Sequence, residues 1–223
     1  MKILHIFTIA CLVLGSALAC AAQEKRLTRD EFYTLFRAGL NKGRGINSRH
    51  VSKTERFADG KIASTEEWQY EYDGPDKVHY VHITVSDGKT RRTDEIDIGE
   101  TYYCKEDDQP WEQVTSSCVG GDAGETPLGD TKYTQEPGRL DNRDITLLGE
   151  YTVYKDTYSK NKDTEGLSFE EWKLWIDKDG FLIREEWTKG LVEPRTMKSS
   201  RVDTYVYDTK IKVEAPIKPT KLS

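Results

Sequence analysis

Three Asp-Gly dipeptides, each 14 residues from the next, divide the first half of the chain into regular segments. They are Asp59-Gly60, Asp73-Gly74 and Asp87-Gly88. Asp-Gly favours the tight two-residue turns that join neighbouring antiparallel strands. Runs of strand character flank these turns, and they span 51–58, 61–72, 77–86 and 89–98. The spacing therefore predicts an antiparallel meander, and the dissimilar sequences of the runs argue against a repeat solenoid.

Within these runs, apolar and polar residues alternate. In the second run, Trp68, Tyr70 and Tyr72 occupy every other position, with charged or amide residues between them. The third run alternates in the same way, with Val81 and Ile83 on its apolar side. Alternation with a period of two is typical of an antiparallel sheet that has one apolar face and one face in water.

An amphipathic helix is expected before the strands. Thr28 and Glu31 have the spacing of a capping box, and Leu27 and Phe32 take the positions of a hydrophobic staple. One apolar stripe follows, made of Phe32, Leu35, Phe36 and Leu40, before Gly43 or Gly45 ends the helix. Because such a stripe must be buried against another element, we expect the helix to pack on the sheet.

The second half of the chain is expected to add a hairpin, a long loop and more strands. The hairpin covers 101–115, and 116–142 contains five Gly and two Pro, which predicts a long surface loop. Further strands are expected at 146–158, 170–177, 181–188 and 195–207, with a last strand beginning at Ile211. About 200 residues after the signal suit one β-rich domain, which we place at 22–217, with a tail at 218–223.

Residues 1–21 have the pattern of a secretory signal peptide. Met1-Lys2 is followed by an apolar run over 3–14 and then by small residues. Three ways of processing stay open: cleavage before Cys20, cleavage after Ala21, and lipidation of Cys20. Simple cleavage is favoured, because Leu18 lies one position later than in a bacterial lipoprotein signal. We therefore expect an exported protein, periplasmic or extracellular, that only a lipid on Cys20 would anchor to a membrane.

Aromatic residues are the strongest indication of a binding surface. The chain contains 12 Tyr and 5 Trp, and its formal charge of −6 argues against nucleic acid as a partner. Aromatic side chains with polar tips suit clefts and wet cavities. The expected ligand-binding residues are Phe32, Phe36, Trp68, Tyr70, Tyr72, Trp172 and Trp187. The alternative is plain core packing under the helix, and both hold together if the core is half open.

Cysteine and histidine spacing bears on disulfide and metal sites. Cys104 and Cys118 are expected to form a disulfide in an exported chain, with a metal or redox pair as the alternative. His79 and His82 are three apart on one strand and so point to opposite faces, which prevents them from sharing an ion. We therefore expect no metal site.

Catalytic motifs give no support for an enzyme. The chain has no Gly-x-Ser-x-Gly elbow, no zinc signature and no phosphate-binding loop. Acidic doublets, at Glu66-Glu67, Glu170-Glu171 and Glu185-Glu186, could suggest paired glycosidase carboxylates. Neighbours on a strand diverge, however, and a charged outer face explains the doublets more simply. We expect neither an enzyme nor a cofactor.

Three segments of the sequence resemble a known family. They are 98–103 with Trp111, the hairpin at 175–185, and 205–208 before 211–217. In these segments the chain is similar to the bacterial lipoprotein-carrier (LolA/LppX-like) superfamily. The resemblance implies a curved, unclosed β-barrel with helices at its mouth and a cavity for acyl chains or other apolar ligands. The chain departs from the pattern in its Cys104/Cys118 pair and in having one expected helix where the carriers have several.

Together these observations predict an α+β fold, mainly antiparallel β, in which a curved half-barrel carries an N-terminal amphipathic helix. The expected function is non-catalytic binding of a lipid or other apolar or amphipathic ligand in the bacterial envelope, by a monomer. The alternative is a protein–protein interaction or envelope-sensing module that uses the sheet edges or the 116–142 loop.

Overall fold

A computed structural model describes residues 24–119, 129–155, 167–208 and 210–218. Within these ranges the chain forms one 12-stranded antiparallel sheet and one helix. The first strands are β1 (Lys25–Leu27), β2 (Ser48–Ala58), β3 (Lys61–Tyr72), β4 (Lys77–Ser86), β5 (Lys89–Ile98) and β6 (Thr101–Glu106). The others are β7 (Glu112–Val114), β8 (Asp130–Leu140), β9 (Arg143–Lys155), β10 (Leu167–Asp177), β11 (Leu182–Leu191) and β12 (Thr196–Tyr207).

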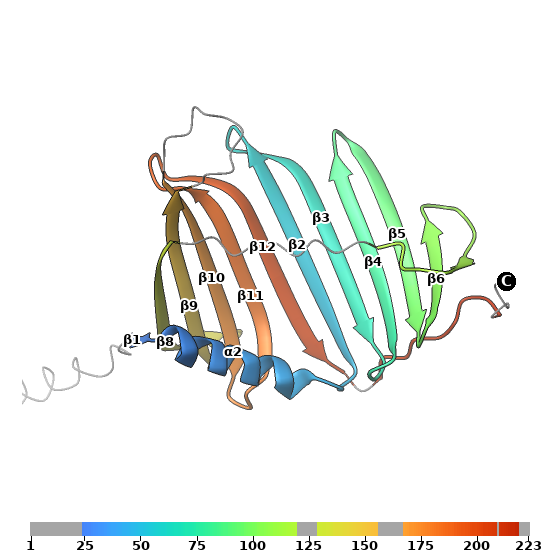
Figure 1. Cartoon of the computed structure of the whole chain (residues 1–223), viewed down its shortest axis with the longest axis horizontal. Coiled ribbons are helices and arrows are strands. Elements are labelled where there is room, and N and C mark those ends of the chain that lie inside the picture. The colour runs from blue at the N-terminus through green and yellow to red at the C-terminus, as the bar shows by residue number, and fades with distance from the viewer. Residues whose placement is uncertain (1–23, 120–128, 156–166, 209, 219–223) are drawn as a thin grey trace, which may run out of the picture.

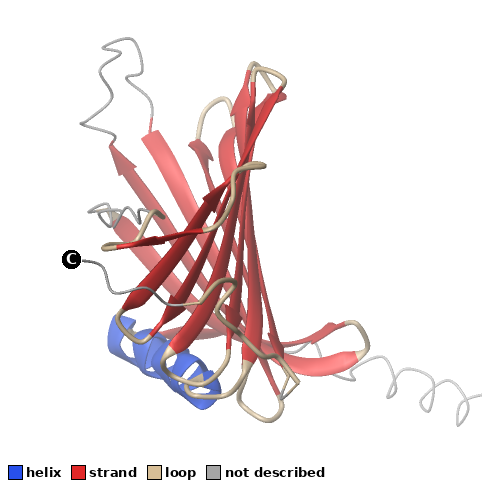
Figure 2. Cartoon of the chain, turned by 90° about the vertical axis from the view of Figure 1, so that its right-hand side faces the viewer, coloured by secondary structure: helices blue, strands red, loops and turns tan. Residues whose placement is uncertain are grey.

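Two meanders make up the sheet (Figure 1). Strands β2 to β7 pair in chain order, and so do β8 to β12. The pairing of β12 with β2, with Tyr205 opposite His50, joins the two meanders, and β1 adds to the outer side of β8. Figure 2 shows the curvature of the sheet from the side. The predicted fold class, a curved and unclosed antiparallel half-barrel with one packed helix, is confirmed.

Two of the three Asp-Gly dipeptides form the predicted two-residue turns, whereas Asp73-Gly74 lies in a longer connection, 73–76, between β3 and β4. Asp59 and Gly60 have φ angles of 51° and 72°, and Asp87 and Gly88 have 52° and 71°. Positive φ at both central residues is what a two-residue hairpin turn with the twist of a β-sheet requires. The bounds of β3, β4 and β5 coincide with the predicted runs 61–72, 77–86 and 89–98.

Helix α2 (Arg29–Gly43) covers one end of the concave face of the sheet (Figure 1). Its capping box is present, since the Thr28 hydroxyl accepts from the Glu31 N–H and the Glu31 carboxylate accepts from the Thr28 N–H. Phe32, Leu35 and Phe36 of the predicted apolar stripe pack on the sheet as expected, whereas Leu40 is exposed. The fully buried members of this core are Phe32, Leu148, Leu174 and Leu182. Within the described residues, no helix is both long enough and apolar enough to cross a membrane.

The prediction of a loop over 116–142 is wrong in its second half, where β8 lies. Pro137 and Gly138 suggested a break, but β1 covers β8 only from Tyr133 to Gln135. Pro137 therefore lies where β8 has a strand on one side only, a position that tolerates proline. The turn between β8 and β9 is Asp141-Asn142, with φ angles of 49° and 65°. Both residues have the positive φ of an Asp-Gly turn, although neither is glycine.

The prediction of a last strand after Ile211 is also wrong. The segment crosses the convex face without strand pairing, and side chains satisfy its backbone groups. The Ile211 carbonyl accepts from Asn47 Nδ2 at 2.8 Å, and the Val213 N–H donates to Asp73 Oδ2 at 3.2 Å. Val213 completes a small second core with Ile96 and Tyr103.

We expect the Phe32→Ala substitution to lower the free energy of unfolding by about 3–5 kcal/mol, because it leaves a cavity where the helix meets the sheet. Leu40→Ala on the same helix is the matched control, since Leu40 is 41% exposed, and we expect a change below about 1 kcal/mol. Urea denaturation followed by circular dichroism measures both values. Equal losses in the two variants would contradict the position of the core.

Candidate functional site

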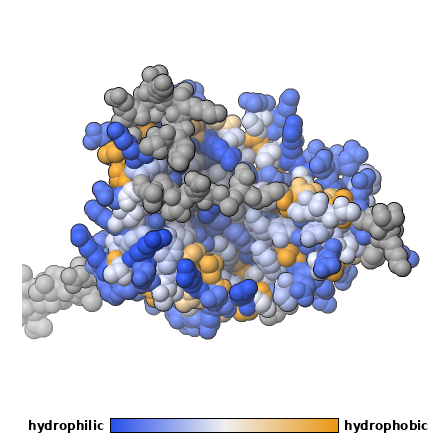
Figure 3. All heavy atoms as spheres, in the orientation of Figure 1, coloured by the Kyte–Doolittle hydropathy of each residue, from blue (hydrophilic) through white to orange (hydrophobic). Residues whose placement is uncertain are grey.

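The concave face contains a cavity of about 1250 Å³ that is open to solvent. Figure 3 shows a hollow on this face, bordered by hydrophilic and intermediate residues. The aromatic residues that line it are Tyr33, Trp68, Tyr70, Tyr80, Tyr102, Trp172 and Trp187. Among the described lining residues Val119 is the single aliphatic one. The lining is therefore aromatic and charged, whereas a site for a bare acyl chain would be largely aliphatic.

One wall of the cavity adjoins a row of stacked rings. Tyr205, His50 and Tyr70 lie directly opposite one another on β12, β2 and β3. Their ring centroids are 4.4 and 4.8 Å apart, with interplanar angles of 8° and 11°. On β3 and β4, Trp68 stacks on His82 at 3.7 Å. Cross-strand register thus stiffens this wall, because each ring is held by its neighbours.

A carboxylate stabilises the Trp68–His82 pair. Glu66 accepts hydrogen bonds from Trp68 Nε1 at 2.9 Å, His82 Nε2 at 3.1 Å and Arg56 at 2.9 Å. Burial raises the pKa of Glu66, but the hydrogen bonds from Trp68 and Arg56 outweigh burial and lower the pKa overall. On another wall, Glu170 lies 3.3 Å from the Lys189 ammonium. Both carboxylates therefore carry a charge that a neighbouring cation balances.

Glu185 and Asp203 lie where the α2 core meets the stacked row. Glu185 accepts from Trp172 Nε1 at 3.0 Å and from the Tyr205 hydroxyl, and burial raises its pKa. Asp203 is only 4% exposed and lies 2.8 Å from both His50 Nε2 and Arg201 Nε. Burial opposes ionisation of Asp203, yet the bonds from His50 and Arg201 lower its pKa. These two carboxylates fix the rings around them.

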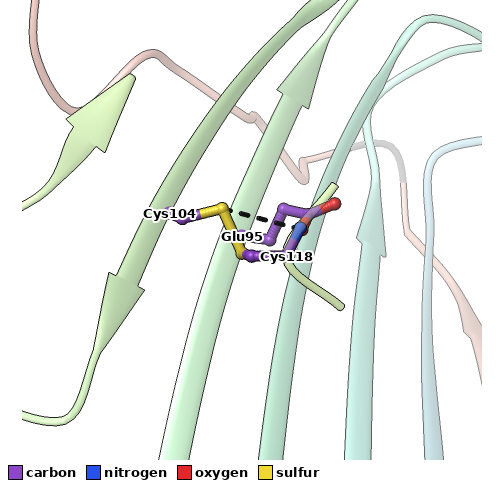
Figure 4. Close-up of side chains that lie close together, drawn as sticks. All are labelled: Glu95, Cys104 and Cys118. Atoms are coloured by element: carbon purple, nitrogen blue, oxygen red, sulfur yellow. Dashed lines mark hydrogen bonds between the residues drawn. A yellow bond between two sulfur atoms is a disulfide. The ribbon is translucent and has the colours of Figure 1, made fainter. Parts of the chain in front are cut away.

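Glu95 and Asp97 form a different kind of pair, on β5. Glu95 is fully buried, and its Oε2 accepts from the N–H groups of Cys118 and Val119 and from the Ser117 hydroxyl at 3.1 Å (Figure 4). Its Oε1 and the Asp97 Oδ1 are buried without a hydrogen-bond partner in the described structure. Burial and the neighbouring Glu95 raise the pKa of Asp97 to about 7.

A disulfide joins Cys104 to Cys118, as predicted (Figure 4). One ligand atom of each cysteine lies within 4.8 Å of the Glu95 carboxylate. The bond takes up both sulfurs that the alternative metal site would have required. Its position fixes the 117–119 segment over Glu95, so the disulfide shapes one wall of the cavity.

The predicted ligand-binding residues separate into two groups. Those that line the cavity are Trp68, Tyr70, Trp172 and Trp187. Phe32 and Phe36 instead pack in the helix–sheet core, and Tyr72 stacks beside Tyr70 at 6.3 Å without lining the cavity. Trp172 belongs to both groups, because Phe36 packs on its ring at 4.7 Å. Contact of any of these residues with a ligand stays a prediction.

Sequence reasoning missed the charged lining of β5 and the tyrosines on either side of it. Trp68 pairs with His82, so Val81 points to the opposite face of the sheet. The aromatic face of β3 and the apolar face of β4 are therefore different faces, although the sequence pattern suggested one. On β5 the same alternation places Ile96 on the convex side and Glu95 in the cavity. A two-residue turn at Asp73-Gly74 would have placed Trp68 and Val81 on one face, and the longer connection over 73–76, with Tyr72 opposite Val78, reverses this relation.

We expect the free energy of unfolding to fall as the pH rises from about 5 to about 8. An acid whose pKa is raised by folding holds its proton more tightly when folded, so its stabilising effect is complete at low pH and is lost through the folded pKa of about 7. Asp97→Asn should remove about 1–2 kcal/mol of this fall, a value reduced by solvent screening. Urea titrations at several pH values measure it. Asp108→Asn, at an exposed position after β6, should leave the fall unchanged, and an unaltered pH dependence in Asp97→Asn would contradict the assignment.

No protein-family model and no curated protein matches the chain. Its structure is similar to the lipoprotein LppX of Mycobacterium tuberculosis, with a TM-score of 0.46, 14% identity, and coverage of 84% of this chain and 100% of that one. For LprF of Mycobacterium bovis the TM-score is 0.46 and the identity 11%, with coverage of 85% of this chain and 98% of that one. For a LolA superfamily protein of Nitrosomonas europaea the TM-score is 0.30 and the identity 9%, with coverage of 78% of this chain and 90% of that one.

Proposed function

We propose that this chain is a non-catalytic binding protein that holds an amphipathic ligand in its concave cavity. The observation that carries the proposal is the open cavity of about 1250 Å³ with its aromatic and charged lining. Cavities of about this size enclose lipid-sized or drug-sized molecules. A filled half-barrel would have favoured the protein-interaction alternative, so the open cavity supports ligand binding. The signal-peptide pattern supports an exported protein, which we expect to act as a monomer.

The lining offers apolar surface to one part of the ligand and charged groups to another. The rings of Trp68, Trp172 and Trp187 offer flat apolar surface, and each burial of about 100 Å² of ligand contributes about 2.5 kcal/mol. A few hundred Å² then gives roughly micromolar binding after the costs of association. The charged side chains favour a polar or charged group at one end of the ligand. A ligand with both parts fits this lining better than a simple hydrocarbon chain does.

The side chains that would meet the ligand are held in place before it arrives. Trp68 donates to Glu66 and stacks on His82, and Trp172 donates to Glu185. Side chains fixed in this way lose little further freedom on binding, which lowers the entropic cost of association. Preorganisation of this kind supports binding without a large movement of the sheet.

Native mass spectrometry of the mature protein, purified from the cells that export it, tests this proposal. We expect a co-purifying small molecule that is lost on denaturation. Trp187→Ala should reduce its occupancy several-fold, because Trp187 lines the cavity. Trp175→Ala is the matched control, since Trp175 lies on the opposite face of the sheet beneath the Arg184 guanidinium. We expect normal occupancy in this control.

A bare polypeptide in the unsubstituted protein, or equal occupancy in both variants, would refute the proposed cavity site. The intact mass of the denatured protein also shows whether Cys20, which lies outside the described residues, is lipidated or removed. A diacylglycerol adduct would show lipidation, and a mass without Cys20 would show cleavage after it.

A further inference from the structure

The carboxylates of the cavity outnumber its cations. The lining contains Glu66, Glu95, Asp97, Glu150 and Glu170 against Arg56, Lys189 and Arg201, five acids and three bases. The two acids that form ion pairs with these bases are Glu66 and Glu170. Within the described chain, no cation lies in ion-pair distance of Glu95 or Asp97. The lining acids left without an ion pair in the described structure are Glu150 on β9, which accepts from the Tyr33 hydroxyl at 3.2 Å, and the adjacent pair Glu95 and Asp97 on β5.

Burial makes this unpaired charge costly. Glu95 is 0% exposed, and only its Oε2 is satisfied, by the 117–119 segment. Its Oε1 and the Asp97 Oδ1 are buried without a partner among the described residues. A buried carboxylate oxygen without a donor costs free energy, and a charged one costs more. A ligand that brought a positive charge and hydrogen-bond donors to this place would remove that cost.

The surroundings of the pair are tyrosines. Tyr80 lies opposite Glu95 on β4, and Tyr102 lies opposite Asp97 on β6, and both line the cavity. Tyr70 and Tyr72 on β3 are further titratable neighbours, since both interact electrostatically with Tyr80. On the same face of β4 the basic group that lines the cavity is His82, and Glu66 holds it at 3.1 Å. Aromatic faces attract organic cations, and phenol hydroxyls can accept from an ammonium group.

We propose that Glu95 and Asp97 bind a protonated amine at the polar end of the amphipathic ligand. The inference rests on the proposed function and names the chemical class of its ligand. An organic ammonium suits the site better than a hard metal ion, because calcium takes six to eight oxygen ligands and the pair is enclosed by rings. The ammonium meets the partly exposed Asp97 carboxylate from the cavity, beside the buried charge of Glu95, and the apolar part of the ligand extends toward Trp68 and the rest of the aromatic lining.

The site predicts a pH dependence of amine binding. The ammonium competes with the proton that Asp97 binds, and burial beside Glu95 raises the pKa of Asp97 to about 7. An alkylammonium, like the lysine side chain with its pKa of about 10.4, stays protonated throughout the range of interest. We therefore expect the affinity for an amine to increase about tenfold or more between about pH 6 and about pH 8. Affinity for a neutral ligand should not change.

Calorimetric titration of the mature protein with three probes of equal chain length tests the inference. The probes are octylammonium, octyl glucoside and octanoate, each below its micelle concentration. At about pH 8 we expect octylammonium to bind most tightly, and Asp97→Asn to weaken it about tenfold or more, as loss of a charged hydrogen bond implies. Asp97→Asn should leave octyl glucoside binding unchanged, which shows an intact cavity. Asp94→Asn, on the convex side of the same strand, is the matched control and should leave all three unchanged.

The outcomes separate this inference from the proposed function. Equal binding of octylammonium and octyl glucoside, or no effect of Asp97→Asn, would overturn the amine site and keep the binding role. Displacement of octylammonium by calcium that is lost in Asp97→Asn would reassign the pair to a metal ion and overturn the inference. Absence of binding for all three probes would overturn both proposals.

Discussion

The register between β12 and β2 is the constraint on which the rest of the molecule depends. It joins two meanders that would otherwise be separate sheets, and it places Tyr205, His50 and Tyr70 in one line. The contact of His50 with Asp203 at 2.8 Å adds a polar restraint to the same pairing. A shift by one residue would send these rings to the opposite face. The stacked wall of the cavity therefore depends on this register.

The helix and the cavity also share side chains, with Trp172 at their boundary. On one side the Trp172 ring packs against Phe36 in the core beneath α2. Its indole N–H donates to Glu185. The free energy that folds the N-terminal helix onto the sheet thus also orients a residue of the cavity. A half-open core of this kind explains why core packing and ligand binding were not separable from the sequence.

How much could be predicted from the sequence follows from how local each signal is. Two of the three Asp-Gly turns, the capping box at Thr28 and the disulfide depend on local sequence or on an oxidising environment, and they were predicted correctly. β8 was missed because its tolerance of Pro137 depends on a distant partner, β1, which ends before it. The acidic doublets diverge as expected, yet the outer-face explanation holds only for Glu67 and its counterparts, which form surface ion pairs. Their partners, such as Glu66, face the cavity, because which face is concave is a property of the whole sheet.

The disulfide makes the structure of one cavity wall depend on the redox conditions around the protein. Cys118 belongs to the segment that supplies the hydrogen bonds to Glu95, and its bond to Cys104 is the covalent tether of that segment to β6. Reducing compartments keep such cysteines as thiols, whereas oxidising ones pair them. A chain with reduced cysteines therefore lacks the tether over the acidic pair. Oxidation of the two thiols completes this wall, so the shape of the pocket depends on the redox state of its surroundings.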